Sequence, residues 1–192
     1  VNNVNNVTNN TEFHLQDLID GTMINLFFNN NKWDISTRSN IGGNNTNQNK
    51  SFKQLFNSCK GDTIDHNKLN TNFTYSFVLL HKDNRNISKI SENKLVLVDV
   101  YDLENFNYIY NLESLTEIPN TINKIVTHKY TTINEVNNHI NKFKNLDIDY
   151  NWKGYTIKFN NNRFKFLNKN YIYVHNLRNN ISNTKLLFCN LY

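Results

Sequence analysis

Hydrophobic and polar positions in the first part of the chain predict a β-hairpin. Residues 23–28 are a short apolar run, and residues 32–37 alternate, with Trp33 and Ile35 on one face. Between them lie the Asn residues 29–31, and Asn tolerates the positive φ that a tight turn requires. We therefore expect two paired strands here.

The middle of the chain predicts one helix and two long strands. Residues 51–59 place Phe52, Leu55 and Phe56 at helical spacing, which indicates a short amphipathic helix after a loop at 39–50. Two strongly apolar segments follow, at 71–81 and 94–101. The second is expected to be central in its sheet because its apolar run is unbroken.

The last third predicts a helix, a second hairpin and a final strand. Residues 131–143 have apolar side chains at helical spacing, and Thr132 and Glu135 suit a capping box at the start of this helix. A hairpin is expected where residues 152–159 and 163–167 flank the Asn residues 160–162, and a last strand or turn and strand at 169–177. The order predicts an α+β fold, mostly antiparallel sheets with short helices.

Composition and charge change this picture little. Asn makes up roughly a fifth of the 192 residues and Ala is absent, a bias that AT-rich coding explains and that also favours strand-forming residues. Residues 1–11 are expected to be a disordered N-terminal segment, and 12–192 a single domain. The net charge of +5 permits a polyanionic partner such as RNA or DNA without requiring one.

Metal sites, membrane spans and secretion find no support in the sequence. Cys59 and Cys189 are expected to be reduced structural thiols, and the histidines lack the spacing of a metal site. No long apolar span is present and we expect no signal peptide, and Asn-x-Ser/Thr sequons such as Asn72-Phe73-Thr74 are expected by chance at this Asn content. We expect a cytoplasmic or virion-associated protein that is not secreted.

Several segments, in this order, resemble the adenylation domain of RNA ligases and the guanylyltransferase domain of mRNA capping enzymes. Asp20-Gly21-Thr22 resembles the end of a Lys-x-Asp-Gly motif, and residues 36–39 (STRS) a Thr-Lys/Arg-Gly segment. Residues 75–81 with Asn84-Arg85 are similar to a Phe-Glu strand and its Pro-x-Asn-Arg turn. Residues 153–158 (KGYTIK) resemble Glu-Gly-x-Val-x-Lys, and 163–167 (RFKFL) resemble Arg-x-Lys-x-Lys.

The resemblance covers roughly residues 20–180 and implies a ligase-like nucleotidyltransferase domain, ATP-grasp-like in architecture. The nearest likeness is to uncharacterised ligase-like proteins of large DNA viruses. It implies nucleotide-binding or nucleic-acid-binding roles for the residues that match: Asp20, Gly21, Arg38, Arg85, Lys153, Lys158, Arg163 and Lys165. An active member would use ATP or GTP with magnesium; otherwise no cofactor is expected.

The reactive groups of this family are missing from the matching positions. Covalent nucleotidyl transfer needs a lysine amine to attack the α-phosphate and acidic residues to hold the metal. The nucleophile position is Leu18, and the two Glu positions are Val78 and Lys153. The second Lys of the closing strand is Leu167. We therefore expect no catalytic residue and no metal site.

Three functions remain open from the sequence. The first is a catalytically degenerate domain that binds RNA, DNA or a nucleotide. The second is a structural or assembly subunit of a viral particle or complex that uses the fold as a scaffold. The third is an active ligase with a relocated nucleophile, Lys153 or Lys158. The aromatic residues Phe159, Phe164, Phe166, Tyr171 and Tyr173 are interpreted as core rather than as a base-stacking platform.

Overall fold

The computed structural model describes residues 12–44, 46–47, 50–84, 86–144 and 146–178. The predicted disordered segment 1–11 lies outside the described residues. The described residues form two compact units. The first unit comprises residues 12–19, 87–89 and 128–178, and the second comprises residues 20–86 and 90–127, apart from the gaps just given. The expected single domain stays a prediction, and each unit is described separately below.

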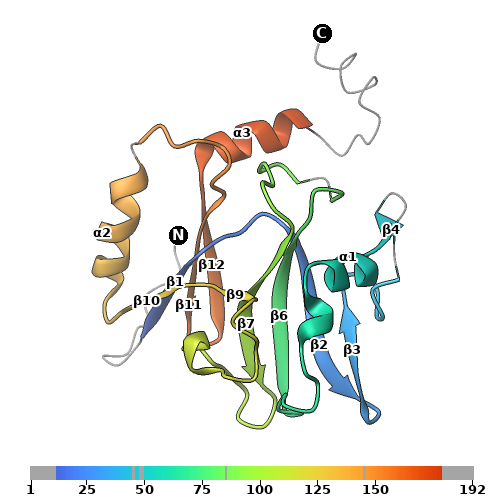
Figure 1. Cartoon of the computed structure of the whole chain (residues 1–192). Helices are drawn as coiled ribbons and strands as arrows, with labels where there is room; N and C mark the ends of the chain where they lie inside the picture. The colour runs from blue at the N-terminus through green and yellow to red at the C-terminus, as the bar shows by residue number, and fades with distance from the viewer. Residues whose placement is uncertain (1–11, 45, 48–49, 85, 145, 179–192) are drawn as a thin grey trace. The chain divides into compact units, whose positions relative to one another are not determined.

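The first unit is built on a four-stranded sheet. Its strand order is β10-β1-β11-β12, with β1 at Phe13–Asp17, β10 at Thr127–Tyr130, β11 at Gly154–Phe159 and β12 at Asn162–Leu167. Strand β11 pairs antiparallel with both β1 and β12 (Figure 1). The hairpin expected in this region is confirmed, whereas β1 was not predicted.

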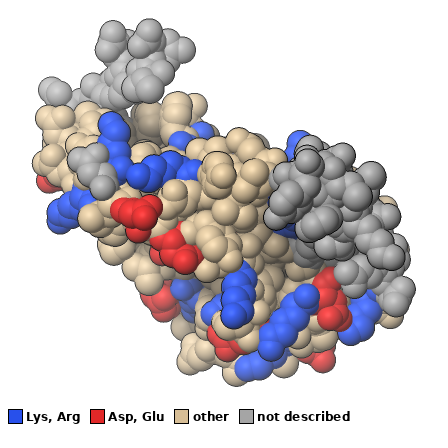
Figure 2. All heavy atoms as spheres, turned by 90° about the horizontal axis from the view of Figure 1, so that it is seen from above, with Lys and Arg blue, Asp and Glu red and all other residues tan. Residues whose placement is uncertain are grey.

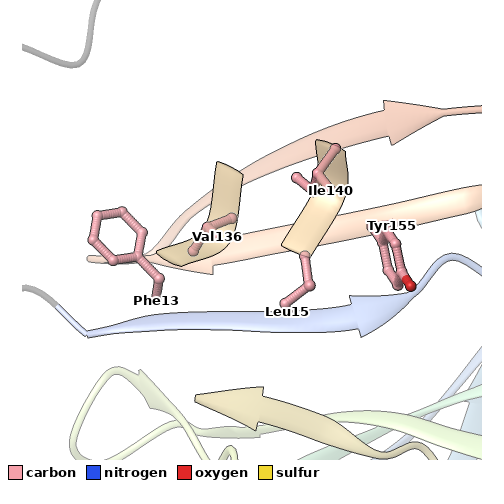
Figure 3. Packing of buried hydrophobic residues seen from close by; sticks show 5 residues of the cluster. All are labelled: Phe13, Leu15, Val136, Ile140 and Tyr155. Carbon is pink, nitrogen blue, oxygen red and sulfur yellow. The ribbon is translucent and has the colours of Figure 1, made fainter. Parts of the chain in front are cut away.

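Helix α2 (Ile133–Lys144) covers one face of this sheet and forms the core of the unit. Figure 3 shows Val136 and Ile140 of α2 directed toward Phe13 and Leu15 of β1 and toward Tyr155 of β11. All of these side chains are buried. The predicted capping box is confirmed, because Thr132 Oγ1 accepts from the Glu135 N–H at 3.3 Å and Glu135 Oε2 accepts from the Thr132 N–H at 3.1 Å.

His139 of α2 contacts two tyrosine hydroxyl groups beside this core. One ring nitrogen lies 2.6 Å from Tyr130 Oη and the other 3.1 Å from Tyr155 Oη. Burial lowers the pKa of His139, and nearby His128 and Lys142 lower it further. Burial also raises the pKa of Tyr155 to about 12. This helix face therefore holds a neutral imidazole in a largely aromatic setting.

The prediction of a last strand at 169–177 is wrong, because Lys169–Arg178 form helix α3. The residues Tyr171 to Val174 have high strand propensity, which misled the expectation. Tertiary contacts override that propensity. Asn168, which precedes the helix and is buried, accepts from the Asn170 N–H through its side chain, and Tyr171 is buried. The Asn168 amide also donates to the carbonyls of Asp149 and Trp152, both at 2.9 Å.

The second unit is built on a larger, mostly antiparallel sheet with the order β3-β2-β6-β7-β8. Its strands are β2 (Thr22–Asn29), β3 (Lys32–Ser36), β6 (Phe73–Leu80), β7 (Lys94–Asp102) and β8 (Asn107–Tyr108). The two-residue strand β9 (Asn123–Lys124) pairs parallel with β7, so β7 is interior as predicted. Within the predicted loop 39–50, Thr46–Asn47 (β4) and Lys50–Ser51 (β5) pair as two short strands.

Helix α1 (Phe52–Ser58) packs on one face of the larger sheet, as its spacing predicts. Its buried Phe56 meets Phe77 of β6 with ring centroids 5.7 Å apart. Ser51 and Gln54 form a capping box at its start. Two short 3₁₀ turns complete the unit, η1 at Gly61–Thr63 and η2 at Leu112–Ser114. Cys59 is a buried free thiol, and Cys189 lies outside the described residues.

Both predicted hairpins turn on paired asparagines. Asn30 and Asn31 have φ values of 47° and 59°, and Asn160 and Asn161 have 44° and 60°. Two successive residues with positive φ match the twist of a two-residue hairpin connection, which normally requires Asn, Asp or Gly. The turn predictions at 29–31 and 160–162 are therefore confirmed in position and in physical reason.

Candidate nucleic-acid interface

One face of the four-stranded sheet is polar, and it is opposite to the face that α2 covers. Cross-strand pairing aligns His14 with Lys158 and Gln16 with Thr156 on β1 and β11. The same register aligns Lys158 with Arg163 and Thr156 with Lys165 on β11 and β12. Directly paired residues project on the same side of a sheet. We call these six residues the polar face: His14, Gln16, Thr156, Lys158, Arg163 and Lys165.

The polar face combines a buried centre with an exposed edge. Lys158 is only 2% exposed, and its ammonium donates a 2.5 Å hydrogen bond to Gln16 Oε1. Arg163 and Lys165 on the edge strand are exposed, and Arg163 Nε donates to Thr156 Oγ1 at 3.0 Å. Burial of an ammonium costs free energy, and the hydrogen bond to Gln16 offsets part of that cost.

The six residues of the polar face include three cations and one histidine. Burial lowers the pKa of His14, and the neighbouring Lys129 and Lys158 lower it further, while Glu12 opposes the shift. The imidazole is therefore neutral near pH 7. None of the six residues is acidic, so the face carries the charge of two lysines and one arginine.

Leu18, at the position where the resemblance expects a nucleophilic lysine, directly follows β1. Its side chain is 9% exposed, and its N–H donates to the Gly154 carbonyl at 2.8 Å. Gly154 has a φ of +137°, and a Cβ there would lie 2.0 Å from the Phe166 carbonyl oxygen. The backbone around this position is therefore closely packed, and an aliphatic side chain contributes no proton donor or acceptor.

Lys153, at one of the expected Glu positions, interacts with α3. Its ammonium lies 5.3 Å from the centroid of the Tyr171 ring, a cation–π geometry. Asn168 anchors the same segment, since its N–H donates to the Lys153 carbonyl at 3.0 Å. Lys153 therefore has a structural contact and is absent from the six residues of the polar face.

Three further predicted site residues, Asp20, Gly21 and Arg38, belong to the second unit. Asp20 and Gly21 lie between β1 and β2, and a Cβ on Gly21 would come within 2.4 Å of Val78 Cγ1 and 2.7 Å of the Leu79 carbonyl oxygen. Arg38 follows β3 and is exposed. Arg85 lies outside the described residues.

Two buried side chains that follow β6, His81 and Asn84, make hydrogen bonds with their neighbours. The buried Asn84 donates to Thr22 Oγ1 at 2.8 Å, which ties this turn to the start of β2. His81 is also buried, and its Nδ1 accepts from the Asp83 N–H at 3.0 Å. Burial lowers the pKa of His81. These contacts give the motif-like segment at 81–84 a role in holding two strands together.

The aromatic residues of the last hairpin and α3 divide between core and surface. Tyr171 is buried, and Phe159 and Phe166 are partly buried against the core of the first unit. Phe164 is 48% exposed and Tyr173 66% exposed, so their assignment to the core is wrong. Phe164 stacks on Phe159 with centroids 5.5 Å apart, as expected at an edge strand where one side has no neighbour.

One face of the molecule carries charge of both signs. On the face seen in Figure 2, Lys and Arg side chains are interspersed with Asp and Glu. Among the described residues no group of three His, Cys, Asp or Glu side chains is placed to hold a metal ion. The helices in the described part of the chain are all too short or too polar to cross a membrane.

Sequence reasoning missed half of the polar face. His14 and Gln16 alternate with the apolar Phe13 and Leu15, a period-two signal that a short strand after a polar segment gives only weakly. Thr156 lies within a predicted strand, but nothing in the sequence alone shows that it faces Arg163. The sequence did identify the three cations that the sheet brings together, Lys158, Arg163 and Lys165.

Comparison with known proteins gives structural neighbours only. No protein-family model matches the sequence, and no curated protein matches it. The structure is similar to an RNA ligase from Naegleria gruberi solved with PPi, at a TM-score of 0.61 and 13% identity over 87% of this chain and 52% of that one. An apo Asp-to-Ala mutant of that ligase gives a TM-score of 0.63 at 14% identity, and a Glu-to-Ala mutant with ATP and Mn gives 0.61 at 13%.

These two mutant structures each align over 88% of this chain and 52% of theirs, so the chain spans about half the length of the ligase. At such identity the likeness establishes the fold alone. The described part of the chain has an α+β fold, with two main sheets and three α-helices, that resembles the nucleotidyltransferase domain of an RNA ligase.

Proposed function

We propose that this chain is a catalytically degenerate, RNA-ligase-like domain that binds nucleic acid through its polar face. The observation that supports the proposal is the alignment of Lys158, Arg163 and Lys165 on one face of adjacent strands. Phosphate groups are attracted to such clustered cations, and the exposed Arg163 and Lys165 on the edge strand are the two that a polynucleotide can reach.

The proposed loss of catalysis rests on the side chain at position 18. A leucine cannot attack phosphorus, and neither Val78 nor Lys153 can supply the carboxylate that a divalent cation prefers. The remaining groups bind charge without breaking a phosphoanhydride bond. We therefore expect affinity for polynucleotide without a covalent nucleotide intermediate.

A labelling experiment tests the catalytic part of the proposal. The protein is incubated with α-labelled ATP or GTP and Mg²⁺ or Mn²⁺, then separated on a denaturing gel. We expect no labelled band, because no suitable amine occupies the nucleophile position. A labelled band would refute the degenerate assignment, and loss of that band in Lys158→Arg would identify the nucleophile.

A relocated nucleophile is the second candidate, and one observation favours it. Lys158 is a buried lysine in the centre of the polar face, and burial of a lysine can support nucleophilic chemistry. The labelling experiment separates this candidate from simple binding, because only the relocated amine yields an adduct.

Filter binding tests the binding part. Single- and double-stranded RNA and DNA of equal length are each titrated with the protein at two salt concentrations. We expect binding that weakens at the higher salt, because counterions released from phosphate drive the interaction. Absence of binding at low salt would contradict the proposal and favour the scaffold role.

A further inference from the structure

A cavity of about 390 Å³ lies within the second unit, between the edge strand β3 and the segment from α1 to residue 66. It has apolar and aromatic walls and an acidic rim. The argument uses six of its lining residues: Leu26, Trp33, Phe56, Asp62, Ile64 and Asp65. None of them belongs to the polar face or to the motif-like segments, so the cavity is a separate feature.

The aromatic wall is held in a fixed position. The Trp33 ring lies 5.4 Å from Phe28, 6.0 Å from Tyr75 and 6.1 Å from His66, measured between centroids. Packing on several sides limits its rotamers while part of the ring still lines the cavity. A pre-oriented indole is the most effective aromatic partner for a cation.

The charge of the cavity rim also favours a cation. Asp34, Asp62 and Asp65 line the cavity together with one lysine, Lys53. Among the described ion pairs, Asp34 pairs with Lys32 and Asp65 pairs with Lys68. In each pair the nitrogen and the oxygen are 3.8 Å apart, which is long for an ion pair.

Both of those lysines are about two-thirds exposed, and exposed pairs of this kind contribute little free energy. A ligand cation can therefore replace them. An anion would instead meet three carboxylates.

We propose that this cavity binds a guanidinium group, either the arginine side chain of a peptide or a small free guanidine. A guanidinium is planar, so it can stack on Trp33 while its N–H groups donate to Asp62 or Asp65 in a fork. Its aliphatic stem would lie on Leu26, Phe56 and Ile64. This inference goes beyond nucleic-acid binding and does not depend on it.

The test is titration of the full chain with two matched ligands, followed by calorimetry and by NMR of the indole N–H signals. N-acetyl-arginine amide carries the guanidinium, and N-acetyl-citrulline amide has nearly the same shape without the charge. We expect the arginine ligand to bind at least about tenfold more tightly. The chain has two tryptophans. The Trp33 signal should shift on binding, while that of Trp152 serves as an internal control.

Variants localise the effect. Asp62→Asn and Asp65→Asn change exposed side chains and should each weaken binding several-fold without unfolding the protein. Glu113→Gln removes an exposed carboxylate elsewhere in the same unit and should leave binding unchanged. Trp33→Leu should reduce the difference between the two ligands, because it removes the cation–π contact and leaves the carboxylates in place. Equal binding of arginine and citrulline, or unchanged binding in both Asp variants, would overturn the proposal.

Two further ligands distinguish the source of the group. The peptide Gly-Gly-Arg-Gly-Gly presents the side chain in a main chain, whereas agmatine is a small free guanidine. Tighter binding of the peptide would assign the cavity to a protein partner, and tighter binding of agmatine would assign it to a metabolite-like cation. Failure of both, with nucleic-acid binding intact, would refute this inference alone.

Discussion

Gly154 shows how one residue constrains the sequence of the candidate interface. Its φ of +137° is accessible only to glycine at low cost, and the Phe166 carbonyl oxygen occupies the space that a side chain would need. The same residue accepts the hydrogen bond of the Leu18 N–H. Backbone packing therefore explains why a glycine follows Lys153, independently of any ligand that the polar face binds.

Replacement of Gly154 by Ala should destabilise the protein by about 3 kcal/mol or more, because strain in the backbone adds to a steric clash with β12. Gly42→Ala is the control. Gly42 has a φ of +85° but meets only the flexible Asn44 side chain, so about 1 kcal/mol is expected. Urea unfolding followed by circular dichroism measures both, and equal losses would contradict the steric argument.

His139 gives a second prediction at this scale, in the pH dependence of stability. Burial places its folded pKa below the ordinary value of 6.5, so the unfolded chain binds more protons near that pH. Its contribution to stability is present above about pH 6.5 and is lost as the pH falls through the folded pKa. His14 and His81 shift in the same direction.

We expect the free energy of unfolding of the wild type to rise between pH 5 and pH 7. His139→Phe should give a shallower rise, since a ring of similar shape keeps the stacking on Phe143 but does not titrate. Denaturant titrations at several pH values give both slopes. Equal slopes for the variant and the wild type would show that His139 does not contribute.

At the scale of elements, capping decides where α2 begins. Thr132→Ala removes the hydroxyl that accepts from the Glu135 N–H and should cost about 1 kcal/mol. Asn138→Ala, at an exposed position inside the same helix, should instead stabilise by a few tenths of a kcal/mol, because Ala has the higher helix propensity. The midpoint temperature of thermal unfolding should therefore fall in Thr132→Ala and rise in Asn138→Ala.

The elements also show what sequence reasoning could and could not reach. Strong periodicity located α1, α2 and the two hairpins, and paired Asn residues located the turns. Helix α3 was mistaken for a strand because local propensity conflicted with the docking of Tyr171 and Asn168. Strand β1 was missed because five residues provide too short a pattern. As a result, His14 and Gln16 of the polar face were not predicted as site residues.

At the scale of the whole molecule, the net charge of +5 gives a weaker argument than its placement. Figure 2 shows both signs of charge mixed on the visible face, so non-specific attraction to a polyanion should be modest. The polar face differs because its cations lie on adjacent strands without a carboxylate among them. Binding should therefore depend on which charges are removed and only weakly on how many.

This dependence can be measured from the salt sensitivity of RNA binding. The double variant Arg163→Gln, Lys165→Gln should reduce the slope of log K against log salt by about 2, one for each lost phosphate contact. The matched control Lys142→Gln, Lys144→Gln removes the same charge from the last turn of α2 and should change the slope little. Similar effects in both pairs would indicate non-specific attraction.

The paired asparagines at the hairpin turns have a consequence for how this fold can be detected. Asn and Gly are among the few residues that adopt a left-handed backbone cheaply, so they are interchangeable at these four positions even though they differ as letters. A lineage can exchange one for the other without altering the hairpin. A comparison that counts identical residues would therefore score such an exchange as a difference although the hairpin is unchanged.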